Sequence, residues 1–150
     1  MGIEQDIEQT SFNSEYHKAL INLIYTHSFV SEKLKQIFDR EEITAQQFNI
    51  LRILRGAGRP ISNLQIRKKM LVKMSDTSRM VDRLLLKGLV EKTSCPSDRR
   101  LVDISISYKG LKLLKHLDAY AEEMDELLNV LSKTEVRELN RILEKIREKK

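Results

Sequence analysis

The chain has 150 residues, enough for one domain with a core, and its 41% hydrophobic and 33% charged residues are ordinary for a helix-rich domain. Aromatic residues make up 5% and Trp is absent, which argues against a stacking platform for single-stranded nucleic acid. No run of about 18 apolar residues and no signal-peptide pattern is present, so we expect no membrane association. The lone cysteine, Cys95, leaves no intramolecular disulfide and is typical of a reducing cytoplasm.

Positive charge is concentrated in the middle of the chain. From Arg55 to Arg100 there are 12 Lys and Arg residues against four acidic residues, a local net charge of +8 within a chain of net charge +5. A basic middle between acidic-leaning flanks predicts a polyanionic partner for that middle segment alone. The alternative is an ordinary solvated helical surface.

Helical periodicity dominates the first half. Apolar residues between about positions 13 and 38 recur at helical spacing and predict one long helix. The capping-box pattern Thr44-x-x-Gln47 opens a second helix, which the glycines and proline of 56–60 end. A further capping box, Ser62-x-x-Gln65, opens a short third helix over 62–70.

A fourth helix is predicted over 75–87, with Ser75 as its N-cap and Gly88 at its end. At helical spacing its apolar positions share one face: Thr77, Met80, Val81 and Leu84. Its polar positions share the opposite face: Ser75, Asp76, Ser78, Arg79, Asp82 and Arg83. A short capped helix directly before such a helix indicates a helix-turn-helix whose second member reads DNA. An ordinary solvent-facing helix would show a similar polar face.

A β-hairpin follows, within LVEKTSCPSDRRLVDISIS (residues 89–107). Val90 opens one strand, and apolar and polar residues alternate over 102–106 in the next. Asp98, Arg99 and Arg100 stand at the tip. An arginine on a thin projecting loop is suited to the minor groove, whose negative potential attracts it. A hairpin in this position predicts a winged helix.

The C-terminal third is predicted to be helical again. Apolar residues from 111 to 131 recur at three- and four-residue steps after Ser107 and indicate one long helix. A third capping box, Ser132-x-x-Glu135, opens a last helix. The fold class we expect is therefore mainly α with a small β-hairpin wing. The wide apolar stripes of the terminal helices predict a two-fold dimer, with recognition helices about 34 Å apart in successive major grooves.

These motifs match those of a known family. The specific part runs from Met74 to Gly110 and contains Gly-Leu-Val at 88–90, the D-x-R step at 98–100 and a closing step at 106–110; Glu41 to Leu54 is similar to the family's second helix. The chain thus resembles the multiple antibiotic resistance regulator (MarR) family of winged-helix transcription factors. The resemblance implies a homodimeric, cytoplasmic regulator, in most members a repressor that binds a palindromic operator and is released by a small aromatic or phenolic ligand. It also implies one domain, 1–150, with a DNA-binding lobe at about 44–107 and dimerisation helices at about 10–40 and 108–148.

The wing residues have expected roles. Arg100, the arginine of the D-x-R motif, is assigned to the minor groove and Arg99 to a phosphate, while Asp98 is expected to orient Arg100 or to brace the wing. A solvated ion pair worth about 0–1 kcal/mol is the alternative for Asp98 and Arg99.

The helix-turn-helix residues are expected to divide between bases and phosphates. Arg79 or Arg83 can read a guanine edge, and Arg83 is equally suited to a phosphate. Ser75 and Ser78 suit phosphates or bases near a helix N-terminus. Asp76 either accepts from a cytosine amine or acts against other sequences. The remaining phosphate contacts are assigned to lysines: Lys68, Lys69 and Lys73.

Other chemistry is sparse. Tyr16, His17 and His27 lie near the first apolar stripe and are candidates for an effector pocket, although a histidine satisfied within a core or interface is the commoner case. No metal-ligand spacing, phosphate-binding loop or catalytic arrangement is present, so we expect no metal, no cofactor and no enzymatic activity. Two alternatives remain: a winged helix that binds a protein partner, and a regulator that responds to oxidants through Cys95.

Overall fold

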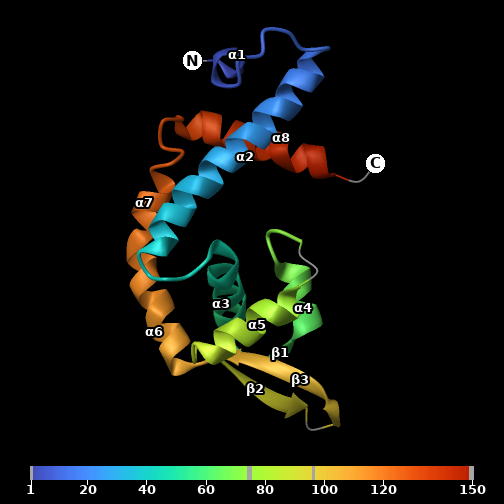
Figure 1. Ribbon diagram of the computed structural model, residues 1–150, viewed down its shortest axis with the longest axis vertical. Coiled ribbons are helices and arrows are strands. Elements are labelled where there is room, and N and C mark those ends of the chain that lie inside the picture. Colours follow the sequence, from blue (N-terminus) through green and yellow to red (C-terminus); the bar gives the residue numbers. More distant parts are fainter. Residues whose placement is uncertain (1, 74–75, 96, 149–150) are drawn as a thin grey trace.

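The helix-turn-helix and its wing occupy the middle of the chain, as Figure 1 shows. The computed structural model describes residues 2–73, 76–95 and 97–148. The lobe contains α3 (Ala45–Ala57), β1 (Ile61–Ser62), α4 (Asn63–Lys69) and α5 (Thr77–Leu86), followed by β2 (Val90–Cys95) and β3 (Asp98–Ile106). This order confirms the mainly helical fold with a small β wing.

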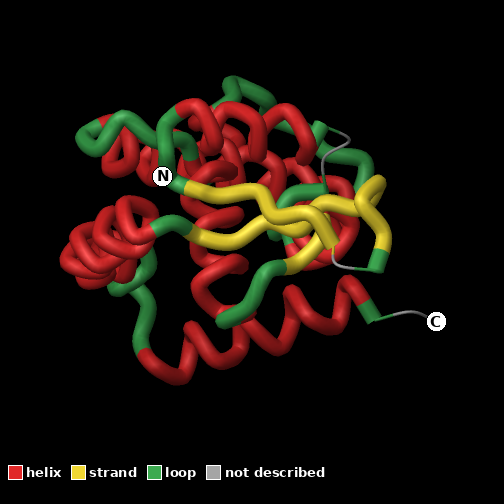
Figure 2. Tube along the Cα trace, turned by 90° about the horizontal axis from the view of Figure 1, so that it is seen from below, coloured by secondary structure: helices red, strands yellow, loops and turns green. Residues whose placement is uncertain are grey.

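The wing belongs to a three-stranded antiparallel sheet in the order β1-β3-β2, visible in Figure 2. Ile61 lies opposite Ile104, and both side chains are buried, so β1 ties the hairpin to the base of α4. The sequence did not predict β1, since two residues are too few to show alternation. The β2–β3 register shifts between Ser94 and Cys95, at the end of the hairpin that carries the two arginines.

Three predicted capping boxes are confirmed, at Thr44, Ser62 and Ser132. The fourth helix starts later than predicted. Helix α5 begins at Thr77, with Asp76 in the N-cap position, because the backbone N–H groups of Arg79 and Met80 donate to the Asp76 carbonyl oxygen. The prediction of Ser75 as N-cap is therefore wrong, and Ser75 itself lies outside the described residues.

One core joins α3, α5, β3 and α6 (Tyr108–Leu117). The predicted apolar face of α5 is buried, at 8% exposure or less for Thr77, Met80, Val81 and Leu84. Fully burying a Leu, Val or Met side chain contributes about 1.5–3 kcal/mol. Burial of this face fixes the rotation of α5 and directs its opposite face to solvent.

The terminal helices lie beyond this lobe. Helix α1 (Ile3–Asp6) is short, and α2 (Glu15–Asp39) matches the predicted long helix. The single helix expected after Ser107 is wrong: α6 is followed by a 3-10 turn, η1 (Asp118–Tyr120), by α7 (Ala121–Asp125) and, after a turn, by α8 (Lys133–Arg147). No Gly or Pro marks the interruption. It coincides with three side chains that bond to other elements: Asp118 to Arg55, Tyr120 to Glu41 and Glu123 to Arg40.

In Figure 1, α6 and α7 rise from the lobe in one curve, and α2 and α8 both lie toward the end of the molecule opposite the wing. The winged lobe thus lies at one end of the molecule, and both chain termini lie toward the other end. No helix among the described residues is both long enough and apolar enough to cross a membrane.

Candidate nucleic-acid interface

The exposed face of α5 is the centre of the candidate interface. Its described polar residues are all exposed, as predicted: Asp76, Ser78, Arg79, Asp82 and Arg83. The guanidinium groups of Arg79 and Arg83 have no hydrogen-bond or ion-pair partner among the described residues. Their donors are therefore available to an external acceptor, and a guanidinium can bind two acceptors of a guanine edge at once.

A hydrogen bond to helix α3 holds the turn before α5. Asn49 is 5% exposed, and its Oδ1 accepts the Leu71 backbone N–H at 2.9 Å. The Lys73 ammonium donates to the Lys68 carbonyl oxygen at 2.7 Å, which links the turn to the end of α4. Lys68, Lys69 and Lys73 are all exposed, as their predicted phosphate contacts require.

The wing is attached to α5 at two places. The Lys92 ammonium of β2 lies 3.2 Å from Asp82 Oδ1 on α5, so an ion pair joins the wing to the polar helix face. At the root of the wing the Ser107 hydroxyl donates to the Gly88 carbonyl oxygen at 2.6 Å and accepts the Gly110 N–H at 3.0 Å. These contacts connect the hairpin to α5 and to the turn that follows it.

The tip of the wing is described in part. Asp98 opens β3 and is partly exposed. Arg99 and Arg100 lie in β3 and Cys95 ends β2, but their side chains lie outside the described part of the structure. The roles assigned to Asp98, Arg99 and Arg100, and the oxidation of Cys95, therefore stay predictions.

The three candidate effector residues do not converge. Tyr16 is 87% exposed and His27 is also exposed, whereas His17 packs edge-on against Phe12, with 5.7 Å between ring centroids. His17 and His27 are ten residues apart on α2, about 15 Å along a helix axis. They do not line the cleft at the end of α3, and an effector pocket at these residues stays a prediction.

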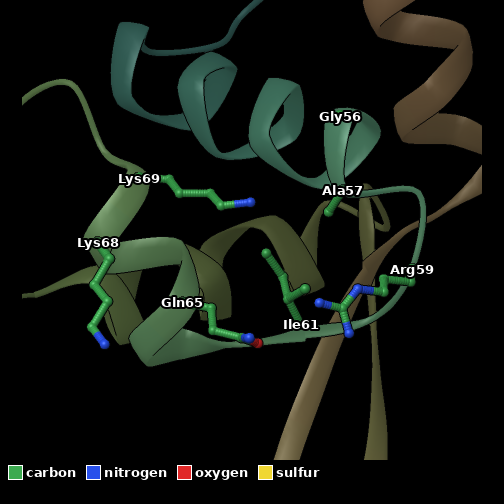
Figure 3. Close-up of a pocket in the computed structure, with 7 residues that line it drawn as sticks. All are labelled: Gly56, Ala57, Arg59, Ile61, Gln65, Lys68 and Lys69. Atoms are coloured by element: carbon green, nitrogen blue, oxygen red, sulfur yellow. The ribbon is translucent and has the colours of Figure 1, made fainter.

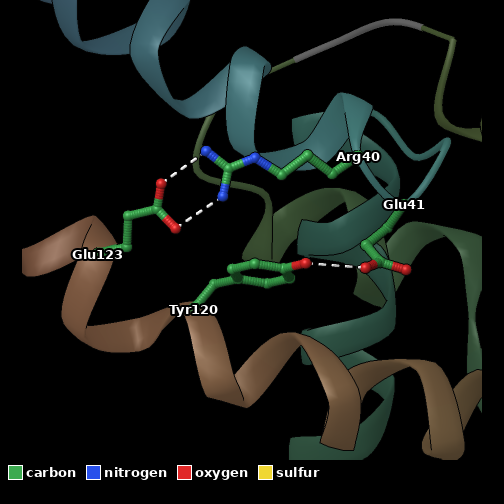
Figure 4. Close-up of polar contacts among 4 residues, drawn as sticks. All are labelled: Arg40, Glu41, Tyr120 and Glu123. Carbon is green, nitrogen blue, oxygen red and sulfur yellow. Dashed lines mark hydrogen bonds and ion pairs between the residues drawn. The ribbon is translucent and has the colours of Figure 1, made fainter.

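The sequence did not predict the polar contacts that join the end of α2 and helix α3 to the segment after α6. Arg40 binds Glu123 through two hydrogen bonds, at 2.7 and 2.8 Å (Figure 4), and Arg55 binds Asp118 in the same way at 2.9 and 3.1 Å. The Arg40 guanidinium lowers the pKa of the Glu123 carboxyl. The partners are more than 60 residues apart, so no local pattern reveals them.

Glu41 is a second polar link. Its Oε1 accepts from the Tyr120 hydroxyl at 3.0 Å and lies 2.8 Å from His116 Nε2. These two contacts, that of Tyr120 above all, lower the pKa of the Glu41 carboxyl. Among the described residues, no group of three His, Cys, Asp or Glu side chains is arranged to hold a metal ion.

A winged helix-turn-helix whose second helix presents free arginines defines a DNA-binding transcription regulator. The family model named MarR family matches residues 43–102. The multiple antibiotic resistance protein MarR of Salmonella typhimurium is 34% identical over 107 residues, covering 70% of this chain and 74% of that protein. The chain therefore belongs to the MarR family.

Two further relatives agree. The transcriptional regulator MhqR of Bacillus subtilis is 28% identical over 131 residues, covering 86% of this chain and 89% of that protein. The structure of a MarR mutant from Escherichia coli, complexed with operator DNA, has a TM-score of 0.81 at 27% identity and covers 92% of this chain and 100% of that one. The winged fold of this chain is thus one that binds operator DNA in a relative.

Proposed function

We propose that this protein is a homodimeric transcriptional repressor that binds a palindromic operator and is released by a small-molecule effector. The observation that carries the proposal is the anchored α5 helix, whose buried face is locked in the core while Arg79 and Arg83 stand exposed and unpaired among the described residues. In this arrangement Arg79 or Arg83 reads bases, and the lysines of α4 and the following turn contact phosphates. The wing adds Arg100 in the adjacent minor groove, supported by Asp98, with Arg99 on a phosphate.

Exposed apolar side chains support the dimer. On α2, Leu20, Ile24 and Phe29 are 54%, 58% and 51% exposed, and on α8 Ile146 is 64% exposed. Apolar surface of this extent on the first long helix and on the last helix is typical of an interface with a second copy. We therefore assign dimerisation to about 10–40 and 108–148 and DNA binding to about 44–107.

The test starts with selection of bound fragments from random DNA. We expect a palindromic consensus, and binding measured by fluorescence anisotropy on that duplex should fall steeply as salt increases. Arg100→Ala and the double variant Arg79→Ala/Arg83→Ala should each weaken binding by about fivefold or more, since one base or groove contact is worth about 1–3 kcal/mol. Arg137→Ala, which removes an exposed arginine on α8 outside the DNA-binding lobe, is the matched control: size-exclusion chromatography should show the same oligomeric state as for the wild type, and affinity should be unchanged.

Two results would contradict the proposal. Equal affinity of wild type, Arg100→Ala and the double variant Arg79→Ala/Arg83→Ala for the selected duplex would remove α5 and the wing from the interface. Absence of any salt-dependent duplex binding would favour the alternative of a winged helix that binds a protein partner.

A further inference from the structure

A cleft of about 320 Å³ lies between the end of α3, strand β1 and helix α4, shown in Figure 3. Its volume is at the lower end of the range for small-molecule sites, about 300–1,000 Å³. Seven residues line it: Gly56, Ala57, Arg59, Ile61, Gln65, Lys68 and Lys69. None of the effector candidates of α2 is among them, so this is a separate site.

The lining is cationic and has no carboxylate. Figure 3 shows the Arg59 guanidinium and the Lys69 ammonium directed into the cleft from opposite sides, with Ile61 between them, while Lys68 extends along the outer edge. None of these three charged groups has a hydrogen-bond or ion-pair partner in the described part of the chain. Positive groups that face one another without a counter-ion repel, and an anion between them removes that repulsion.

Hydrogen-bond donors also dominate the cleft. The Gln65 Oε1 is already occupied, because it accepts the Ser62 backbone N–H at 3.0 Å. The Gln65 amide nitrogen has no partner among the described residues and lies at the edge of the cleft in Figure 3. Together with Arg59 and Lys69 it offers N–H donors from three positions, and an oxyanion accepts from such donors without needing to donate.

The floor of the cleft is apolar. Ile61 is 2% exposed, and the Ala57 methyl group and the glycine at position 56 complete that side. An inorganic anion alone has no apolar part to contact this surface. An acid with a small apolar body places its carboxylate on the cations and its body on Ala57 and Ile61.

We propose that this cleft binds a small organic carboxylate, held between Arg59 and Lys69. Binding neutralises positive charge at Lys69, on the helix that the proposed function places against DNA phosphates, and thereby weakens operator binding. This second step rests on the proposed function, whereas occupation of the cleft does not.

Occupation is tested on the full-length protein without DNA. In ¹H–¹⁵N spectra, sodium benzoate should shift the amide signals of Gly56, Ala57 and Ile61 in a saturable way. Benzamide, the uncharged analogue, and sodium phosphate, which has no apolar body, should each bind at least about fivefold more weakly, since a charge-assisted hydrogen bond is worth about 1.5–3 kcal/mol and a small apolar body about 1.

Variants identify the site. Arg59→Gln and Lys69→Gln should each raise the dissociation constant for benzoate about tenfold. The matched control is Arg52→Gln, an exposed arginine of α3 that does not line the cleft, and it should bind benzoate like the wild type. No saturable shift, equal binding of benzamide, tighter binding of phosphate, or a loss in Arg52→Gln as large as in Arg59→Gln would each overturn the proposal.

A second arm measures the coupling to DNA at constant ionic strength. Saturating benzoate should raise the operator dissociation constant about fivefold in the wild type, the scale of one lost phosphate contact, and have no effect in Lys69→Gln. Benzoate binding without any effect on DNA affinity would overturn the coupling and leave the site in place. Absence of operator binding altogether would refute the proposed function, and the DNA-free titration would still decide the cleft.

Discussion

Replacement of Ser107 by alanine tests how the wing is joined to the recognition helix. The side chain is 7% exposed, caps α6 by accepting the Gly110 N–H, and donates to the Gly88 carbonyl oxygen. Loss of an N-cap costs about 1 kcal/mol. The bond to the Gly88 carbonyl oxygen is part-buried, and its loss costs about 1 kcal/mol more. We expect Ser107→Ala to lower the free energy of unfolding by about 2 kcal/mol.

Ser132→Ala is the matched control. Ser132 caps α8 through the same geometry, with the Glu135 N–H donating to its hydroxyl at 3.2 Å, but it is exposed and makes no second bond of the kind that Ser107 makes to Gly88. Its loss should cost only about 1 kcal/mol.

Urea denaturation measures both variants, and it must be done at one protein concentration because dimerisation shifts apparent stability. Equal losses in Ser107→Ala and Ser132→Ala, with unchanged slopes, would show that the Gly88 bond contributes nothing. The reasoning about the junction would then be refuted.

Three further outcomes are expected. Gly110→Ala should destabilise the fold by about 1–3 kcal/mol in thermal melts, because the added Cβ would overlap the Leu89 carbonyl oxygen; an unchanged melting temperature would contradict this close approach. The pKa of the Glu41 carboxyl is lowered in the folded protein, so its bonds stabilise the fold fully above the ordinary pKa of 4.5, and this stabilisation is lost as the pH falls through the lowered pKa. The urea midpoint of Glu41→Gln should therefore decline less in acid than that of the wild type. Parallel curves of urea midpoint against pH would contradict this. A double-mutant cycle with Asp82→Asn and Lys92→Gln should give a coupling of about 0.5 kcal/mol or less in stability, and a value above about 1 kcal/mol would show that this exposed pair is stronger than its solvent exposure allows.

Local patterns account for what the sequence predicted well. The capping boxes at Thr44, Ser62 and Ser132 connect residues three positions apart, so the signal and the interaction lie in the same short segment. The face of α5 follows from helical spacing alone, and burial of Val81 and Leu84 confirms it. Helical spacing was therefore enough to place the candidate DNA-contacting residues of α5 on one exposed surface.

What the sequence missed depends on distant partners. Strand β1 forms because Ile61 pairs with Ile104 across the sheet. A segment of two residues is too short to predict such a pairing. The interruption after α6 lies where Asp118 and Tyr120 bind residues more than 60 positions earlier. Apolar periodicity continues through this region, because the 3-10 turn η1 and the short helix α7 follow α6 directly and keep a helical backbone.

The structure also divides the positive charge that the sequence presented as one block. Arg79 and Arg83 stand on the exposed face of α5, whereas Arg59 and Lys69 face each other across a cleft formed by α3, β1 and α4. Charge along the chain predicts that a segment attracts an anion, but the packing of the helices decides which anion fits. A flat helix face with free guanidinium groups suits a duplex, and a concave site with an apolar floor suits a small acid. Lys69, predicted from the sequence to contact a phosphate, is directed into the second kind of site in Figure 3, which is why its charge is the proposed link between ligand binding and DNA binding.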